Sequence, residues 1–250
     1  MRVMVWVRCY AELNDFLSPS RRGGEFEVEG DAGGSVKDLL EGLGVPHTEI
    51  DLLLVNGEPA AFDRAIQAGD RVSAYPVFEA FDIAGVTRVR PGPLRDVRFA
   101  LDGHLGRLAA YLRLAGFDTV YRRDVSDDQL VGIAAEQHRV LLTRDQALLK
   151  RKAVTHGSFV HATEPVEQLR EVVARFHLSR LARPFTRCMR CNGSLGPATE
   201  AAIAARVPAR SRAHYVRFLE CEGCGRVYWE GTHYARLRRV MESVVGKRFG

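Results

Sequence analysis

Residues 97–104 read VRFALDGH, an apolar run that ends on an acidic residue, a glycine and a histidine. The first five residues predict a buried β-strand. Residues 105–112 then place leucine and alanine side chains at helical spacing, and Gly116 stops this helix as the residue after its C-cap. A buried strand that leads directly into a helix is how a parallel α/β sheet begins.

The same alternation continues along the chain. Residues 118–121 (DTVY) predict a second strand, and Ser126 with Gln129 predicts a capping box that starts a second helix. Residues 139–143 (RVLLT) predict a third strand. We therefore predict one α/β domain with a parallel sheet over residues 97–182.

Two aspartates directly follow predicted strands, because Asp102 ends the first and Asp145 ends the third. Catalytic groups of open parallel sheets gather at these carboxyl ends. Asp127, in the first turn of the helix between them, is expected to face the same crevice, with Asp128 and Asp124 as further candidates. Clustered carboxylates repel one another unless they share a cation such as Mg²⁺ or Mn²⁺, which can orient water against a phosphodiester. The alternative is that each aspartate only caps a helix.

Basic side chains accompany these aspartates. Arg144 is adjacent to Asp145, and it predicts either a phosphate clamp or a surface ion pair. The remaining candidates for nucleic-acid contact in this segment are Arg107, Lys150, Arg151 and Lys152.

The C-terminal region contains two Cys-x-x-Cys pairs, a spacing that suits four thiolates around one tetrahedral zinc ion. The four ligands are Cys188, Cys191, Cys221 and Cys224. Four thiolates leave no position for water, so we expect a structural zinc rather than a catalytic one. Residues 227–231 (VYWEG) predict a strand of this ribbon, in which Tyr228 and Trp229 either stack on an unpaired base or fill a small core.

Charge divides the chain into two different parts. Residues 1–80 contain 7 basic and 14 acidic residues, whereas residues 81–250 contain 29 and 17. The basic excess on the ribbon-bearing side favours a polyanionic partner such as nucleic acid. We find no apolar run long enough to span a membrane, and Cys9 lies unpaired in an apolar run, which together predict a cytoplasmic protein with an inert strand thiol.

The acidic front part, residues 1–80, predicts an α+β ubiquitin-like β-grasp domain. Its predicted elements follow the order β-β-α-β-β, with a turn at Asn56-Gly57. The segment resembles small sulfur-carrier proteins, but those end in a free Gly-Gly, and this chain continues into a linker at residues 81–96. We therefore expect this domain to dock a protein partner rather than to carry sulfur.

The segments FALDGHLGRL (99–108), LRLAGFD (112–118) and LTRD (142–145) resemble the PIN-like ribonuclease domain of the Mut-seven C-terminal type. Residues 183–188 and 227–234 fit the same pattern, and the front part resembles the ubiquitin-like domain often fused to it. The resemblance implies RNA cleavage at an acidic Mg²⁺ or Mn²⁺ site, with a zinc ribbon and a basic C-terminal tail at residues 183–250. It also implies the role of metal ligand for Asp127, by its match to the helix-opening aspartate of related PIN-like domains.

Two functions from different classes follow. The leading hypothesis is a metal-dependent ribonuclease in which Asp102, Asp127 and Asp145 hold the ion and the ribbon aids RNA binding. The alternative is a non-catalytic RNA- or ribosome-binding adaptor that uses the ribbon and the basic face. Only the carboxylate set distinguishes these hypotheses, because an adaptor has no need for it.

Overall fold

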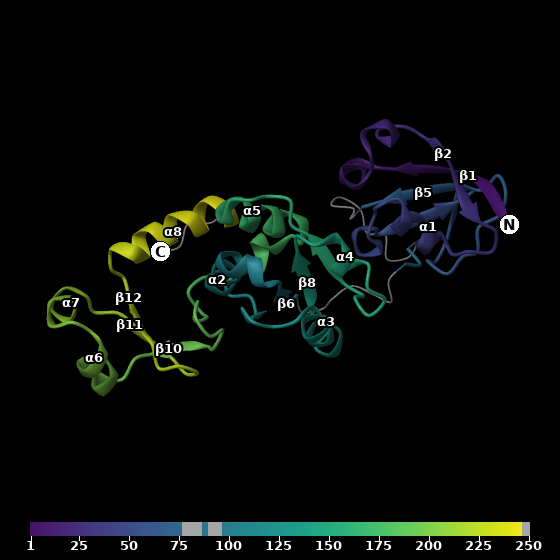
Figure 1. Cartoon of the computed structure of the whole chain (residues 1–250). Coiled ribbons are helices and arrows are strands. Elements are labelled where there is room, and N and C mark those ends of the chain that lie inside the picture. Colours follow the sequence, from purple (N-terminus) through teal and green to yellow (C-terminus); the bar gives the residue numbers. More distant parts are fainter. Residues whose placement is uncertain (77–86, 90–96, 247–250) are drawn as a thin grey trace. The chain divides into compact units, whose positions relative to one another are not determined.

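The computed structural model describes residues 1–76, 87–89 and 97–246 (Figure 1). The chain forms two compact units, one made of residues 1–96 and 131–159 and the other of residues 97–130 and 160–250. The predicted linker at residues 81–96 lies outside the described residues except for 87–89. Within the described ranges, every helix is too short or too polar to cross a bilayer.

The N-terminal part of the first unit is a mixed five-stranded sheet with a helix packed on it. The strands, in their order across the sheet, are β2 (Phe26–Asp31), β1 (Arg2–Cys9), β5 (Arg71–Tyr75), β3 (Leu52–Val55) and β4 (Glu58–Pro59). β1 is parallel to β5 and antiparallel to β2. Helix α1 (Val36–Gly42) begins after Ser35, whose hydroxyl accepts a hydrogen bond from the Asp38 amide. The predicted β-grasp fold is confirmed.

Alternation along β1 builds the core of this sheet. Val5 and Val7 are fully buried beneath it, whereas Met4 and Arg8 on the other face are exposed. Cys9 belongs to the buried set, and burial raises the pKa of its thiol to about 12. A neutral, enclosed thiol is a poor nucleophile, as the sequence predicts for this residue. Three short 3-10 helices complete this part of the unit, η1 (Ala11–Phe16), η2 (Pro19–Arg21) and η3 (His47–Glu49).

The α/β part contains a four-stranded sheet with the strand order β7-β6-β8-β9. The strands are β6 (Phe99–Leu101), β7 (Thr119–Tyr121), β8 (Val140–Thr143) and β9 (Gly157–Phe159). β6 is parallel to β7, and β8 is parallel to β9. All residues of β6 and β8 are buried, which is typical of parallel strands covered on both faces. Three of these strands are predicted from sequence, and β9 is not.

Helices connect these strands and follow the last of them. The connections contain η4 (Gly103–Leu105), α2 (Gly106–Leu114), α3 (Asp127–Glu136) and α4 (Gln146–Leu149), and β9 is followed by α5 (Pro165–Arg175) and η5 (Leu178–Arg180). The predicted capping box is confirmed at the start of α3. The Gln129 amide donates to Ser126 Oγ over 3.3 Å, and the Ser126 amide donates to Gln129 Oε1 over 3.1 Å. These two bonds satisfy amide groups that have no partner within the helix.

The second unit ends in a zinc-ribbon fold followed by a long helix. An antiparallel sheet of β10 (Leu195–Pro197), β11 (Phe218–Cys221) and β12 (Val227–Trp229) is interrupted after β10 by α6 (Glu200–Arg206) and α7 (Ala209–His214). Helix α8 (Thr232–Val245) then packs against α5 (Figure 1). The basic tail predicted at the end of residues 183–250 thus contains a helix. Its apolar residues Leu237, Met241 and Val245 recur every four residues, and the last two are buried.

Candidate functional site

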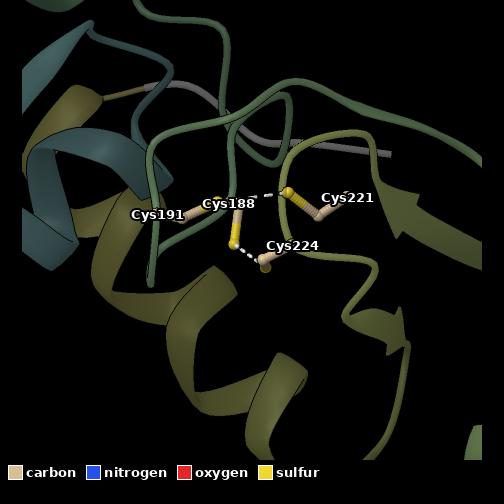
Figure 2. Close-up of side chains that lie close together, drawn as sticks. All are labelled: Cys188, Cys191, Cys221 and Cys224. Atoms are coloured by element: carbon tan, nitrogen blue, oxygen red, sulfur yellow. Dashed lines mark hydrogen bonds between the residues drawn. The ribbon is translucent and has the colours of Figure 1, made fainter.

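The four cysteines of the two Cys-x-x-Cys pairs lie together, and their side chains point toward one another from two loops (Figure 2). All four Sγ atoms are within 4.8 Å of one another. The Sγ atoms of Cys188 and Cys224 are 3.7 Å apart, and those of Cys191 and Cys221 are 3.3 Å apart. Four sulfur atoms at the usual zinc–sulfur distance would be ~3.8 Å apart in a tetrahedron. The donor set and its spacing therefore fit a zinc ion.

Two tight turns, called here the first and second knuckles, bring the pairs together. In the first knuckle (residues 188–193) the Asn192 amide donates to the Cys188 carbonyl over 2.9 Å, and in the second (residues 221–225) the Gly225 amide donates to the Cys221 carbonyl over 2.8 Å. The turn residues have φ values of +74° at Asn192 and +67° at Gly225. Only glycine and, less readily, asparagine adopt this backbone conformation easily, which is why these residue types close the knuckles.

The electrostatics of the cluster favour a cation. Burial opposes ionisation of Cys188, but hydrogen bonds from the Tyr228 hydroxyl and from backbone amides outweigh it and lower the pKa of the thiol to about 6. At Cys191 the Gly193 amide stabilises the thiolate, yet desolvation and the neighbouring sulfur atoms raise its pKa to about 12. Crowded thiols resist joint ionisation unless a divalent ion balances their charge.

A buried arginine fastens the first knuckle to helix α2. Arg113, only 5% exposed, donates from Nη1 to the carbonyl oxygens of Met189 (3.1 Å) and Arg190 (2.9 Å). Its Nε donates to the Thr119 carbonyl over 3.0 Å. Burial lowers the pKa of Arg113, while the nearby acidic groups oppose that shift. Arg113 thus connects helix α2, strand β7 and the first knuckle.

Asn192 makes a second connection between the first knuckle and strand β7. Its Nδ2 donates to Asp118 Oδ1 over 2.8 Å, and its Oδ1 accepts from the Thr119 amide over 3.0 Å. Arg187 adds a bond from Nε to the Gly116 carbonyl over 3.2 Å. Sequence reasoning missed this docking surface. The signal that could have found it is the LRLAGFD segment at residues 112–118, where charged Arg113 and Asp118 flank a helix-ending glycine but belong to neither predicted metal site.

The structure places two of the predicted aspartates directly after strands. Asp102 follows β6, is half-buried and precedes η4. Asp145 follows β8 by two residues, is exposed and caps α4, where its Oδ1 accepts from the Ala147 amide over 2.8 Å. Thr143 Oγ1 in turn accepts from the Asp145 amide over 2.9 Å. Capping uses one carboxylate oxygen, and the other keeps its capacity to bind a cation.

The other acidic candidates lie at the start of helix α3. Asp127 and Asp128 occupy its first turn and are exposed, and Asp124 is exposed in the preceding loop. Their position near the helix N-terminus is electrostatically favourable without a metal. Asp102 and Asp127 belong to the second unit and Asp145 to the first. That the three share one ion stays a prediction.

The basic candidates occupy different environments. Arg107, Arg144 and Lys152 are exposed, and Arg151 is half-buried. Lys150 is also half-buried, and its ammonium donates to the Glu41 carbonyl of the β-grasp part over 2.7 Å, within the first unit. Lys150 therefore has an anchoring role in the structure, and RNA contact by any of these side chains stays a prediction.

Another anchor lies in the same unit. His47 is buried in η3, with Nδ1 2.6 Å from Glu41 Oε1 and Nε2 2.8 Å from the Val154 carbonyl. Buried Glu49 accepts a hydrogen bond from the Phe159 amide over 2.5 Å. These contacts join the β-grasp part to the region of α4 and β9, so the front domain is packed against its neighbour inside the first unit.

The two aromatic candidates of the ribbon face opposite sides of strand β12. Tyr228 is half-buried, and its hydroxyl is 3.0 Å from Cys188 Sγ. Trp229 packs against the small ribbon core of Ala202, Val207 and Val227. The core-filling interpretation thus describes Trp229, and the role of either ring in RNA binding stays a prediction.

Comparison with known proteins identifies both parts of the chain. A family model described as the Mut7-C RNAse domain matches residues 97–241, and a model described as Mut7-C ubiquitin matches residues 2–82. Among solved structures, the crystal structure of H. volcanii small archaeal modifier protein 1 is similar at 24% identity, over 30% of this chain and 97% of that chain, with a TM-score of 0.25. That likeness is too low to carry an argument, and no curated protein matches. Since the RNase model covers more than half of the chain, the protein belongs to the Mut7-C RNase domain family and carries the ubiquitin-like domain of the same type in front of it.

Proposed function

We propose that this protein is a metal-dependent ribonuclease that hydrolyses RNA phosphodiester bonds at a site formed by Asp102, Asp127 and Asp145. The match of the RNase domain over residues 97–241 carries the proposal. It is supported by the placement of Asp102 and Asp145 directly beyond strands β6 and β8, where α/β sheets collect catalytic groups.

Each residue has a distinct task in this proposal. The three carboxylates hold Mg²⁺ or Mn²⁺, because hard cations prefer oxygen ligands. A bound ion of this kind activates water and neutralises charge on the phosphate. Arg144, exposed beside Asp145, contacts a phosphate oxygen and orients the substrate. The four-cysteine ribbon holds a structural zinc and adds a basic surface for RNA.

The front domain and the compartment complete the proposal. We propose that this acidic domain, which matches the ubiquitin-like model, recruits a protein partner. Four thiols that must stay reduced to hold zinc favour the cytoplasm.

The test uses full-length protein freed of Mg²⁺ and Mn²⁺ but kept saturated with zinc. Labelled single-stranded RNA is incubated with each divalent ion, and Asp102→Asn and Asp145→Asn are compared with wild type. Asparagine caps helices about as well as aspartate, so Asp145→Asn should keep α4 and lose only the charge. Asp31→Asn, on an exposed β-grasp strand, is the matched control.

We expect both active-site variants to lose most cleavage, with binding retained and the control unaffected. Equal cleavage by wild type and both variants would reject the aspartate site. The adaptor hypothesis has one specific observation in its favour, since the N-cap role of Asp145 gives that carboxylate a structural purpose. RNA binding without cleavage under any divalent ion would support the adaptor instead.

A further inference from the structure

A cavity of about 850 Å³ lies in the second unit beside the four cysteines. One wall is a face of the ribbon sheet, a second is the first turns of α8, and a third is the segment that leads into the first knuckle. Its volume is within the range of small-molecule sites, which is roughly 300–1,000 Å³. Neither the aspartates nor the metal ligands contribute to its lining.

Strand alternation explains which ribbon side chains reach this cavity. Leu219 of β11 is paired with Tyr228 of β12, so both project from one face of the sheet. Arg217 and Arg226 lie two residues from these positions and share that face. All four line the cavity, whereas Val227 on the opposite face packs into the ribbon core.

Aromatic rings form part of the walls. Phe185 and Tyr234 lie with their ring centroids 4.6 Å apart and their planes tilted by 39°. Tyr228 faces the same space, and its hydroxyl is held by the hydrogen bond to Cys188. Rings fixed in this way can receive a planar group without losing much conformational freedom. Trp229, which also packs against the ribbon core on the other face of β12, contributes to the lining as well.

The charge around these rings is positive. Arg187, Arg217 and Arg226 line the cavity together with a single carboxylate, Glu230. Arg187 donates to the carbonyl oxygens of Gly116 and Asn192, which are neutral acceptors and leave its charge uncompensated. Arg217 lies 3.8 Å from Glu230, but both side chains are well exposed, so this pair is weak. An occupant should therefore combine a flat apolar group with negative charge.

We propose that this cavity binds one unpaired nucleotide of RNA, with its base against Phe185, Tyr228 and Tyr234 and its phosphates against Arg217 and Arg226. A base within a duplex cannot enter such a pocket, whereas a base in a single strand or loop can. The cavity thus selects single-stranded RNA. This inference rests on the proposed function, because it specifies the form of RNA that the ribbon presents for cleavage.

Fluorescence gives a direct test, because the chain has two tryptophans, Trp6 and Trp229. In full-length Trp6→Phe protein, Trp229 at the cavity is the remaining emitter. We expect short oligouridylate, added without Mg²⁺ or Mn²⁺, to quench this emission, and the matching RNA duplex to leave it unchanged. Quenching by both forms alike would overturn the selection of unpaired bases.

Variants distinguish the contribution of base stacking from that of the phosphate contacts. Tyr234→Leu should weaken oligouridylate binding by roughly five- to a hundredfold, and Tyr234→Phe should retain it, because the stacking surface is kept. Arg226→Gln should instead lower the slope of log affinity against log salt by about 0.7. Tyr215→Leu and Arg210→Gln, which lie outside the cavity, are the matched controls. Circular dichroism verifies that each variant is folded.

The outcomes distinguish this inference from the proposed function. Unchanged affinity in folded Tyr234→Leu, together with unquenched Trp229 when anisotropy reports bound RNA, would show that RNA lies elsewhere and end the inference. Cleavage that persists in that protein would leave the nuclease intact. Conversely, selective quenching by single strands with no cleavage under any divalent ion would support the cavity and reject the nuclease.

Discussion

Replacement of Gly116 by alanine tests how tightly the metal knuckle is built onto the α/β domain. Gly116 ends α2 with a φ of +97°, and the chain segment that leads to Cys188 passes directly against it. An added Cβ would lie 2.4 Å from the Arg183 carbonyl oxygen and 3.1 Å from Thr186 Oγ1. The first of these atoms belongs to the backbone, so the contact cannot be relieved by a side-chain rotation.

Two terms set the magnitude. A left-handed backbone costs a non-glycine residue roughly 1–2 kcal/mol, and overpacking adds roughly 1–3 kcal/mol. We expect Gly116→Ala to lower the free energy of unfolding by roughly 2–5 kcal/mol. Gly132 in α3 is the matched control, since an added Cβ there meets nothing within 4 Å. Gly132→Ala should stabilise the protein by roughly 0.5–1 kcal/mol.

The assay is denaturant unfolding of the zinc-loaded proteins, followed by circular dichroism, with the rate of zinc transfer to a chromogenic chelator as a second measurement. Gly116→Ala should shift the midpoint down and release zinc faster, because the displaced segment leads into the first knuckle. A midpoint equal to wild type, or shifted upward as for Gly132→Ala, would refute the close approach of the two segments.

Three further predictions concern Arg113, the zinc site and Cys9. Arg113→Met should destabilise the protein by roughly 2–4 kcal/mol because three carbonyl acceptors lose a charged donor, and a thermal melt within error of wild type would contradict this. Chelation of zinc should lower the melting temperature, since metal binding and folding are coupled in ribbons; an unchanged melt would count against a zinc-held fold. The raised pKa of Cys9 stabilises the fold below the unfolded value of 9.0, and this contribution is lost as pH rises toward about 12. Between about pH 8 and about pH 10, Cys9→Ala should therefore lose about 1.4 kcal/mol less stability than wild type, and parallel losses in urea melts would disprove the assignment.

Local signals made most of the fold predictable from the sequence. Alternation in residues 2–10, the Ser126 capping box and the apolar strand before Asp102 each specify an element without tertiary information. β9 escaped prediction because Gly157 and Ser158 carry little apolar signal, and burial by neighbouring segments defines that strand instead. Helix α8 was not predicted, because its three arginines obscured the apolar side chains that recur every four residues.

The four cysteines could be predicted from the sequence, whereas the contacts that hold them against the α/β domain could not. Cysteine spacing alone predicts the four ligands, because the chemistry of zinc fixes both residue type and geometry. Arg113 and Asn192 could not be predicted, since each acts on a partner more than 70 positions away in the chain. Such contacts have no local periodicity, and only the folded chain reveals them.

These long-range contacts give the zinc cluster a structural path to the proposed nuclease site. Asn192 in the first knuckle holds the amide of Thr119, the first residue of β7. Thr119 is paired with Phe99 of β6, and the Tyr121 hydroxyl donates to the Gly103 carbonyl over 2.9 Å, one residue beyond Asp102. Loss of zinc would therefore loosen the start of β7 and, through its pairing with β6, the strand that leads to Asp102. A metal without an open coordination position can in this way influence cleavage that it does not itself perform. This is a physical reason for the ribbon and strands β6 and β7 to share one unit.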